Sequence, residues 1–158
     1  VYDYGPFVFF EMLQRQIGTQ AYFAALDLLL RDHPEERITT ERLRTYLEAS
    51  SGASLREFFD FWVYVGALPS LRLEYAYERT GGRTSVTGTL RADVPYGSFH
   101  VPVVLTDGDW GERTVWVEVV DGEGNLQAEG FRVPKPKVRV DPEGWVLAAD
   151  RKAKRVKR

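Results

Sequence analysis

Few side chains in this sequence are suited to chemistry. The chain has no cysteine, so it forms neither a disulfide bond nor a thiolate metal site or nucleophile. Its two histidines, His33 and His100, lie far apart in sequence, and most zinc sites and histidine triads therefore cannot be assembled from this chain alone. The remaining candidate is Tyr2-Asp3-Tyr4-Gly5, directly before an apolar helical pattern. Its two aromatic side chains either carry chemistry or simply pack ahead of that helix.

Other polar candidates have simpler structural explanations. His33 comes late in a helical pattern, where it can interact with the negative end of the helix. His100 fits an ordinary strand position. The group Asp107, Asp109 and Glu112 resembles fragments of a calcium loop, but the glycine and the distal glutamate of an EF-hand are not in place. This group therefore predicts a hairpin turn.

Four aromatic residues of the second half are candidates for a carbohydrate or peptide platform: Tyr75, Tyr77, Trp110 and Trp116. Alternating aromatic residues in strands usually form a core or cross-strand pairs. We therefore expect these side chains to pack within the protein and not to bind a ligand.

The first part of the chain has apolar residues at helical spacing, which predicts helices. Four segments show this pattern: 6–17, 19–32, 39–52 and 54–66. Thr19 is placed to cap the second helix, and the pair Thr39 and Thr40 precedes the apolar residues of the third. Ser54 and Glu57 have the spacing of a capping box for the fourth. Four helices joined by short links predict a small bundle.

Near Pro69 the pattern changes from helical spacing to alternation, which predicts strands. The predicted strands are 71–78, 85–91, 99–106, 113–120, 126–133, 137–140 and 145–148. Gly81-Gly82 can turn the first hairpin. About seven strands at this spacing are typical of an immunoglobulin-like antiparallel β-sandwich. The predicted fold class is therefore α+β, a four-helix segment followed by such a sandwich.

Charge is distributed unevenly along the chain. Residues 151–158 hold six basic residues and no acidic one, whereas the rest has 15 basic and 23 acidic residues, a net charge of −8. We expect a solvated basic tail over 151–158, and the acidic remainder argues against nucleic-acid binding. No apolar run approaches the roughly 18–20 residues that span a bilayer, and the start lacks a secretory signal pattern. The sequence predicts a soluble protein without a transmembrane segment, whose compartment stays open.

The opening segment resembles Y-x-K-G, which carries the catalytic tyrosine in zinc aminopeptidases of the membrane alanyl aminopeptidase family, a family that includes leukotriene A hydrolase. The resemblance continues in order downstream and ends with a series typical of the end of the catalytic domain: Leu55, Phe58, Phe59, Trp62, Gly66, Pro69 and Leu71. It extends more loosely to residue 148. Tyr4 departs from the pattern, because lysine is usual there.

The resemblance implies that residues 1–69 are the C-terminal part of a thermolysin-like, gluzincin catalytic domain, that 70–150 form the β-sandwich and that 151–158 are a tail. It also implies that Tyr2 is the catalytic residue, donating its phenolic hydrogen bond to the oxyanion of the tetrahedral intermediate. The zinc motif H-E-x-x-H and the segment G-x-M-E-N, which holds the substrate's amino terminus, do not occur in the chain. Zinc would therefore be bound upstream.

A fragment of this kind would have two partners, an upstream catalytic segment of the same protein and a peptide substrate, and would be inactive alone. The alternative is a non-enzymatic scaffold or protein-interaction module derived from the same fold. Immunoglobulin-like sandwiches host many unrelated functions, so the predicted fold permits both.

Overall fold

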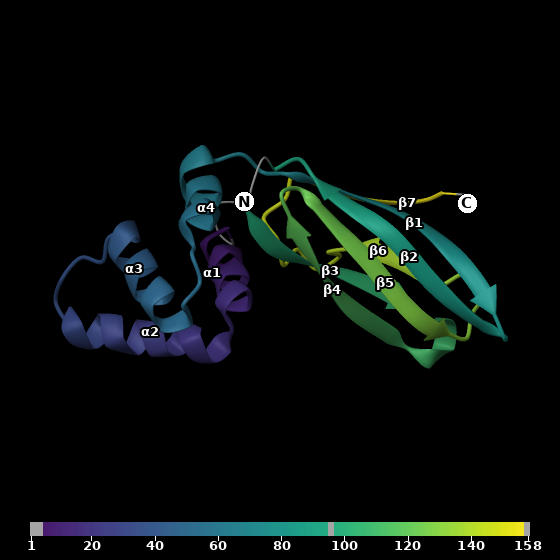
Figure 1. Cartoon of the computed structure of the whole chain (residues 1–158), viewed down its shortest axis with the longest axis horizontal. Helices are drawn as coiled ribbons and strands as arrows, with labels where there is room; N and C mark the ends of the chain where they lie inside the picture. The colour runs from purple at the N-terminus through teal and green to yellow at the C-terminus, as the bar shows by residue number, and fades with distance from the viewer. Residues whose placement is uncertain (1–4, 95–96, 157–158) are drawn as a thin grey trace. The chain divides into compact units, whose positions relative to one another are not determined.

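The computed structural model describes residues 5–94 and 97–156 of the chain. The chain divides into two units, Val1–Ala67 and Leu68–Arg158. The described residues form helices in the first unit and strands, with one short 3-10 turn, in the second (Figure 1). We call these the helical unit and the β unit. The predicted α+β fold class is confirmed.

The helical unit contains the four predicted helices. They are α1 (Gly5–Ile17), α2 (Thr19–Asp32), α3 (Thr40–Ser51) and α4 (Arg56–Phe59), which continues as the π-helical turn η1 (Asp60–Val65). The fourth segment was predicted as one helix, and the structure shows that its hydrogen-bond pattern widens at Asp60. The buried side chains come from all four helices: Met12, Leu13, Tyr22, Ala25, Leu29, Leu47, Leu55, Phe58, Phe59 and Phe61.

The threonines at the starts of the second and third helices differ in role. Thr39 caps α3, because its Oγ1 accepts a hydrogen bond of 3.2 Å from the Arg42 backbone N–H. Thr19 does not cap α2. Gly18, at φ 83°, takes the N-cap position, and Thr19 lies inside the helix and accepts from Gln14 Nε2 at 3.1 Å. The positive φ favours a glycine there, which explains why the cap moves by one residue.

The predicted capping box of the fourth helix is wrong. Leu55 is the N-cap residue of α4 and makes no side-chain cap bond. The Leu55 backbone N–H instead donates to Glu48 Oε1 of α3 at 2.7 Å. A carboxylate of α3 therefore accepts the hydrogen bond of a backbone N–H at the start of α4, and the predicted Ser54–Glu57 capping box does not form.

The β unit contains seven strands, as predicted. They are β1 (Ser70–Thr80), β2 (Arg83–Ala92), β3 (Ser98–Thr106), β4 (Glu112–Val120), β5 (Glu123–Phe131), β6 (Lys137–Val140) and β7 (Asp150–Arg155). The Gly81-Gly82 turn joins β1 to β2, as predicted. The predicted turn at Asp107-Gly108-Asp109 lies between β3 and β4, where Gly108–Trp110 form the 3-10 turn η2.

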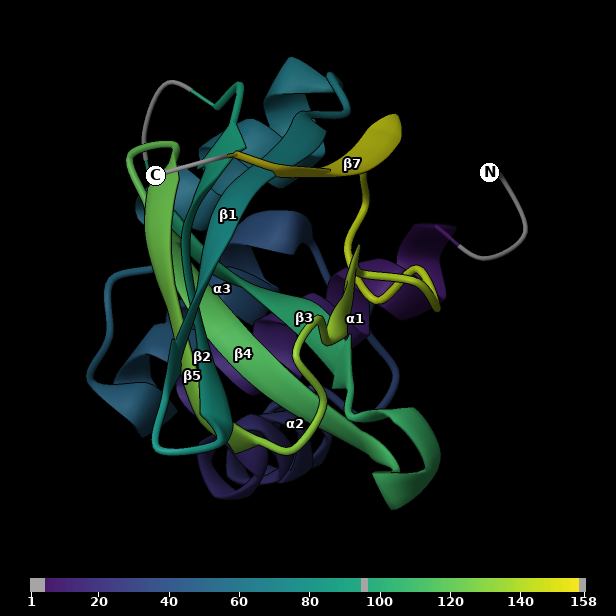
Figure 2. The same ribbon diagram turned by 90° about the vertical axis from the view of Figure 1, so that its right-hand side faces the viewer.

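The strands form one sheet in the order β6-β3-β4-β5-β2-β1-β7, and all pairs are antiparallel except the parallel pair β1–β7. The two packed sheets of the expected immunoglobulin-like sandwich are not what the structure shows. Strand twist accumulates across the seven strands. The sheet therefore curls until its edge strands β6 and β7 approach each other, and it is nearly closed (Figure 2).

The final strand differs from the prediction. Residues 145–148 were expected to form it, but they lie in an irregular segment. β7 begins at Asp150 and otherwise lies within residues 151–158, which were expected to be a solvated tail. β7 pairs with β1 from Ser70–Asp150 to Tyr75–Arg155. The sequence of β7 lacks the apolar alternation that predicts a strand. Its strand conformation therefore depends on pairing with the open edge of β1. Residues 152–155 remain exposed.

The inner face of the curled sheet forms the core of the β unit. Its most deeply buried apolar side chains are Leu71, Leu73, Val86, Leu90, Val101, Val103, Leu105, Val117, Val119, Leu126, Phe131 and Val146. Alternate residues of β1 and β2 supply several of them, as expected for strands with one face buried. Within residues 5–94 and 97–156, no helix has both the length and the apolar character needed to cross a membrane.

Candidate functional site

The predicted catalytic residue, Tyr2, lies outside the described residues, as does Tyr4. What the structure places is the helix that follows them. α1 begins at Gly5, so the candidate segment leads directly into this helix.

α1 is held in the helical unit by buried apolar contacts. Met12 and Leu13 are buried, and Leu13 is fully removed from solvent. The Phe9 ring lies 5.7 Å from the Phe58 ring and 5.8 Å from the Phe59 ring, measured between centroids. These contacts join α1 to α4.

Several large apolar side chains of the helical unit remain exposed. Phe7 of α1 is 59% exposed, and Phe23 and Leu30 of α2 are 57% and 62% exposed. Exposed apolar surface of this kind is typical of faces that contact another protein or another part of the same protein.

His33 lies where the sequence predicted, at the C-terminal end of a helix. Its backbone N–H donates to the Leu29 carbonyl at 3.1 Å, and its ring lies 3.2 Å from the Tyr46 hydroxyl through Nε2. Tyr46 also donates to Asp32 Oδ2 at 2.7 Å, and this hydrogen bond raises the pKa of the Tyr46 phenol above its usual value. The group links α2 to α3 and has a structural role.

The acidic group at the β3–β4 turn does not form a calcium loop. Asp107 Oδ1 accepts hydrogen bonds from the backbone N–H groups of Arg132 and Val133, at 2.7 and 2.9 Å. Glu112 pairs with Arg139 at 2.5 Å. Across the part of the chain that the structure describes, no three His, Cys, Asp or Glu side chains are grouped so that they could hold a metal ion.

The four aromatic residues do not form one platform. Tyr75 and Tyr77 of β1 contact each other edge to face, with centroids 5.5 Å apart. Trp110 lies in the turn η2 and not in a strand, and it is 67% exposed, so the expectation that it packs within the protein is wrong. The Arg132 guanidinium stacks 3.9 Å from its ring centroid. Trp116 of β4 lies opposite Pro102 of β3. His100 of β3 lies opposite Glu118 of β4, so it occupies an ordinary strand position, as predicted.

Tyr77 gives the β unit a predictable response to alkaline pH. Its hydroxyl donates to the Pro136 carbonyl at 2.6 Å, and burial, followed by hydrogen bonding with Tyr75, raises the pKa of its phenol above the usual value of about 10. Above about pH 10 the unfolded chain gives up this proton while the folded chain keeps it. The unfolded state then binds fewer protons, so stability falls as pH rises.

We therefore expect Tyr77→Phe to lose about 1 kcal/mol at pH 7, from the missing hydrogen bond. Above about pH 10 its free energy of unfolding should fall less steeply with pH than that of the wild type. Urea unfolding at a series of pH values measures both quantities. Parallel pH profiles for the two proteins would contradict the assignment.

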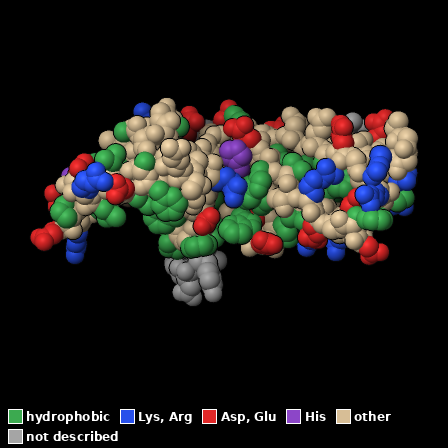
Figure 3. Space-filling model, turned by 90° about the horizontal axis from the view of Figure 1, so that it is seen from below, with side chains coloured by type: hydrophobic (Ala, Val, Ile, Leu, Met, Phe, Trp, Pro, Cys, Tyr) green, Lys and Arg blue, Asp and Glu red, His purple; other side chains and the backbone are tan. Residues whose placement is uncertain are grey.

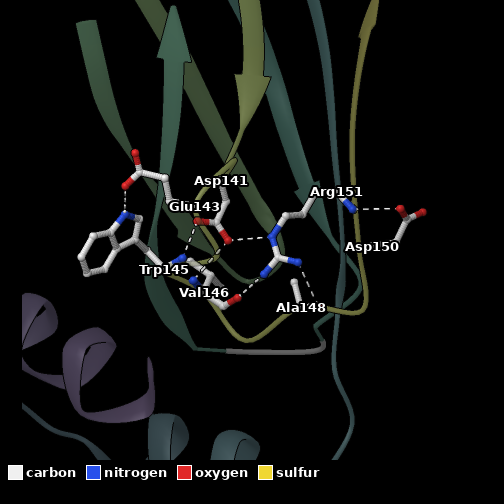
Figure 4. Close-up of polar contacts among 7 residues, drawn as sticks. All are labelled: Asp141, Glu143, Trp145, Val146, Ala148, Asp150 and Arg151. Carbon is white, nitrogen blue, oxygen red and sulfur yellow. Dashed lines mark hydrogen bonds and ion pairs between the residues drawn. The ribbon is translucent and has the colours of Figure 1, made fainter. Parts of the chain in front are cut away.

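The most extensive polar network of the β unit surrounds Asp141, which the sequence did not mark as a site residue (Figure 4). Asp141 is 1% exposed. Its Oδ2 lies 2.7 Å from Arg151 Nε, and its carboxylate accepts the backbone N–H groups of Trp145 at 2.7 Å and Val146 at 3.1 Å. The guanidinium also donates to the carbonyls of Val146 at 2.5 Å and Ala148 at 3.2 Å.

This network organises the segment between β6 and β7. Asp141 itself adopts a positive φ of 39°, which aspartate tolerates better than most residues. Burial raises the pKa of its carboxyl above the usual value, and the hydrogen bonds from Arg151 and the backbone act in the opposite direction. The network joins an irregular segment to the first residues of β7 and has the properties of a structural clamp, not of a reaction centre open to substrate.

Comparison with known proteins shows what this fold is similar to. No protein-family model matches the sequence, and no curated protein matches it. Among solved structures, the chain is similar to aminopeptidase A of Legionella pneumophila, solved in complex with aspartic acid, with a TM-score of 0.71 and 18% sequence identity. This chain shares its fold with part of that protein. The similarity covers 90% of this chain but only 17% of the aminopeptidase chain, so this chain corresponds to a small part of that enzyme's length.

The structural similarity agrees with the sequence resemblance at the level of the fold. The Tyr2–Gly5 segment and the apolar series ending at Leu71 also resemble an aminopeptidase. Asp141 of the clamp lies within the looser part of the resemblance, and Arg151 lies in the run that was expected to be a solvated tail. A lone aspartate before a proline gives no signal of burial, so the sequence could not reveal the clamp.

Proposed function

We propose that this chain is the C-terminal part of a zinc-dependent aminopeptidase similar to the membrane alanyl aminopeptidase and leukotriene A hydrolase family, an enzyme that removes N-terminal residues from peptides. The observation that carries the proposal is the shared fold with part of an aminopeptidase, over 90% of this chain. The helical unit would be the end of a thermolysin-like catalytic domain, and the β unit would be the domain that follows it.

In this proposal Tyr2 acts at the reaction centre. A phenol has an ordinary pKa of about 10, so it keeps its proton at neutral pH. It would donate a hydrogen bond to the oxyanion that forms when water adds to the scissile carbonyl.

Zinc would be held by residues upstream of this chain. The side chains present here do not fit a zinc site, since the sequence has no cysteine and only two histidines, and the described residues contain no group of three suitable ligands. The upstream catalytic segment of the same protein is therefore the partner that this chain requires, and the peptide is the substrate of the whole enzyme.

A second candidate function is a non-enzymatic scaffold or protein-interaction module derived from the same fold. Tyr4 favours it, because this residue stands where the resembled family usually has lysine. The exposed Phe7, Phe23 and Leu30 also fit a surface that contacts a partner.

The coding sequence upstream of Val1, together with an assay of the whole protein, distinguishes the two functions. The aminopeptidase requires an upstream H-E-x-x-H helix with a later glutamate, preceded by G-x-M-E-N. The whole protein should then contain about one zinc ion and release amino acids from aminoacyl substrates, while residues 1–158 alone release none. An upstream region without zinc ligands, or a zinc-loaded protein without activity, would support the scaffold.

A further inference from the structure

Three arginine side chains from three strands or their ends converge on one hollow of the β unit. The hollow has a volume of about 310 Å³, and its lining includes Arg83, Arg113, Arg132 and Trp110. Arg83 begins β2, Arg113 lies near the start of β4, and Arg132 directly follows β5. In the space-filling view, Lys and Arg side chains lie among Asp and Glu side chains at the right-hand end (Figure 3).

Each of the three guanidinium groups is held in place by an uncharged neighbour. Arg113 Nη2 donates to the Glu129 carbonyl at 2.7 Å, and its Cζ lies 4.2 Å from the Phe131 ring centroid. The Arg132 Cζ lies 3.9 Å from the Trp110 ring centroid. Arg83 Nη1 donates to the Gly130 carbonyl at 3.4 Å.

None of these three arginines forms an ion pair with a carboxylate of the described residues. The two carboxylates in the lining have other partners. Asp107 accepts two backbone N–H groups, and Glu112 pairs with Arg139 at 2.5 Å. The hollow therefore carries an excess of positive charge in a protein whose first 150 residues have a net charge of −8. Several guanidinium N–H groups remain to bind an oxyanion.

A second hollow of about 530 Å³ shares Arg83 and Gly130 with the first. Its lining differs in chemistry, since it has the hydroxyl-bearing residues Thr80 and Ser85 and the carboxylates of Glu78 and Glu129. Carboxylates accept hydrogen bonds from hydroxyl groups, so this lining suits a molecule with several hydroxyls.

From these two adjoining hollows we propose a binding site for the phosphate ester of a small polyhydroxylated molecule. The three arginines bind the phosphate, and the second hollow takes the hydroxylated part. A phosphate offers three terminal oxygens and a charge near −2, so guanidinium groups from different strands can each contact it, whereas a planar carboxylate offers two oxygens. The site lies wholly within the β unit and is independent of the proposed peptidase function.

Titration of the 158-residue chain with glucose 6-phosphate, followed by calorimetry and NMR at constant ionic strength, tests the proposal. We expect saturable binding that is tighter than binding of inorganic phosphate, and no binding of glucose. Absence of saturable binding would overturn the site. Equal affinity for glucose 6-phosphate and inorganic phosphate would overturn the role of the second hollow.

Charge-matched variants separate this site from general surface charge. Arg113→Gln and Arg132→Gln should each weaken binding about tenfold, because each removes charged hydrogen-bond donors. Arg91→Gln is the control, since Arg91 lies on β2 but pairs with Glu74 at 3.6 Å and Glu123 at 3.4 Å. Equal weakening by the control would contradict the proposal. Arg113 and Arg132 stack on aromatic rings, so their replacement could prevent folding. In that case Arg83→Gln tests the site, because it removes only one long hydrogen bond, to the Gly130 carbonyl.

Discussion

Replacing Tyr2 by phenylalanine in the whole protein should lower kcat about 10²–10³-fold and leave KM and zinc content unchanged. In the proposed function, the substitution removes the phenolic O–H that would donate to the oxyanion and keeps the aromatic ring. The oxyanion exists only in the transition state and the intermediate that follows it. The loss should therefore appear in turnover and not in substrate binding.

Tyr4→Phe is the matched control for this experiment, because Tyr4 lies two residues away and makes the same chemical change without a proposed role. Steady-state kinetics on aminoacyl substrates measure both variants. We expect Tyr4→Phe to stay within a few-fold of the wild type. An active enzyme in which Tyr2→Phe has no effect, or in which both variants fall equally, would show that Tyr2 is not the oxyanion donor.

Replacing Asp141 by alanine should destabilise the β unit by about 3 kcal/mol. The change leaves the Arg151 guanidinium without its carboxylate and removes the acceptor of the Trp145 and Val146 backbone N–H groups. It also places alanine at a positive φ of 39°. The Arg151 side chain is 28% exposed, so water relieves part of the penalty and the effect lies at the lower end of the range for buried pairs.

Two variants show whether the loss comes from the clamp. Asp150→Ala removes a neighbouring carboxylate that pairs with Lys152 near the surface, and it should cost less than about 1 kcal/mol. Asp141→Asn keeps an acceptor and tolerates the backbone conformation, so it should fall between the wild type and Asp141→Ala. Urea unfolding followed by tryptophan fluorescence measures all three. Equal losses for Asp141→Ala and Asp150→Ala would show that the buried pair does not hold the segment.

Most secondary structure could be predicted because it depends on local periodicity. The four helices bury residues at helical spacing, such as Leu13 and Leu29, and β1 alternates between buried Leu71 and Leu73 and the exposed residues beside them. Patterns of this kind act within one element, so a single sequence contains them in full. The candidate site was predictable in a different way, through the resemblance around Tyr2, and its geometry lies outside the described residues.

Local signals failed where a distant part of the chain supplied the partner. Ser54 and Glu57 have the spacing of a capping box, yet Glu48 of the preceding helix bonds to the helix start. Residues 151–155 belong to a run predicted to be a solvated basic tail, yet they pair with the open edge of β1 as a strand. In both cases the competing partner becomes available only when separate elements pack together.

The sequence by itself therefore determined the four helices, the first six strands, their order and the change from helical to β structure near Pro69. Tertiary structure decided the single curled sheet, the burial of Asp141 against Arg151 and the convergence of Arg83, Arg113 and Arg132 on one hollow. The physical reason is that periodicity is a property of neighbouring residues, whereas strand order, burial and convergent charge depend on which distant segments meet when the chain packs.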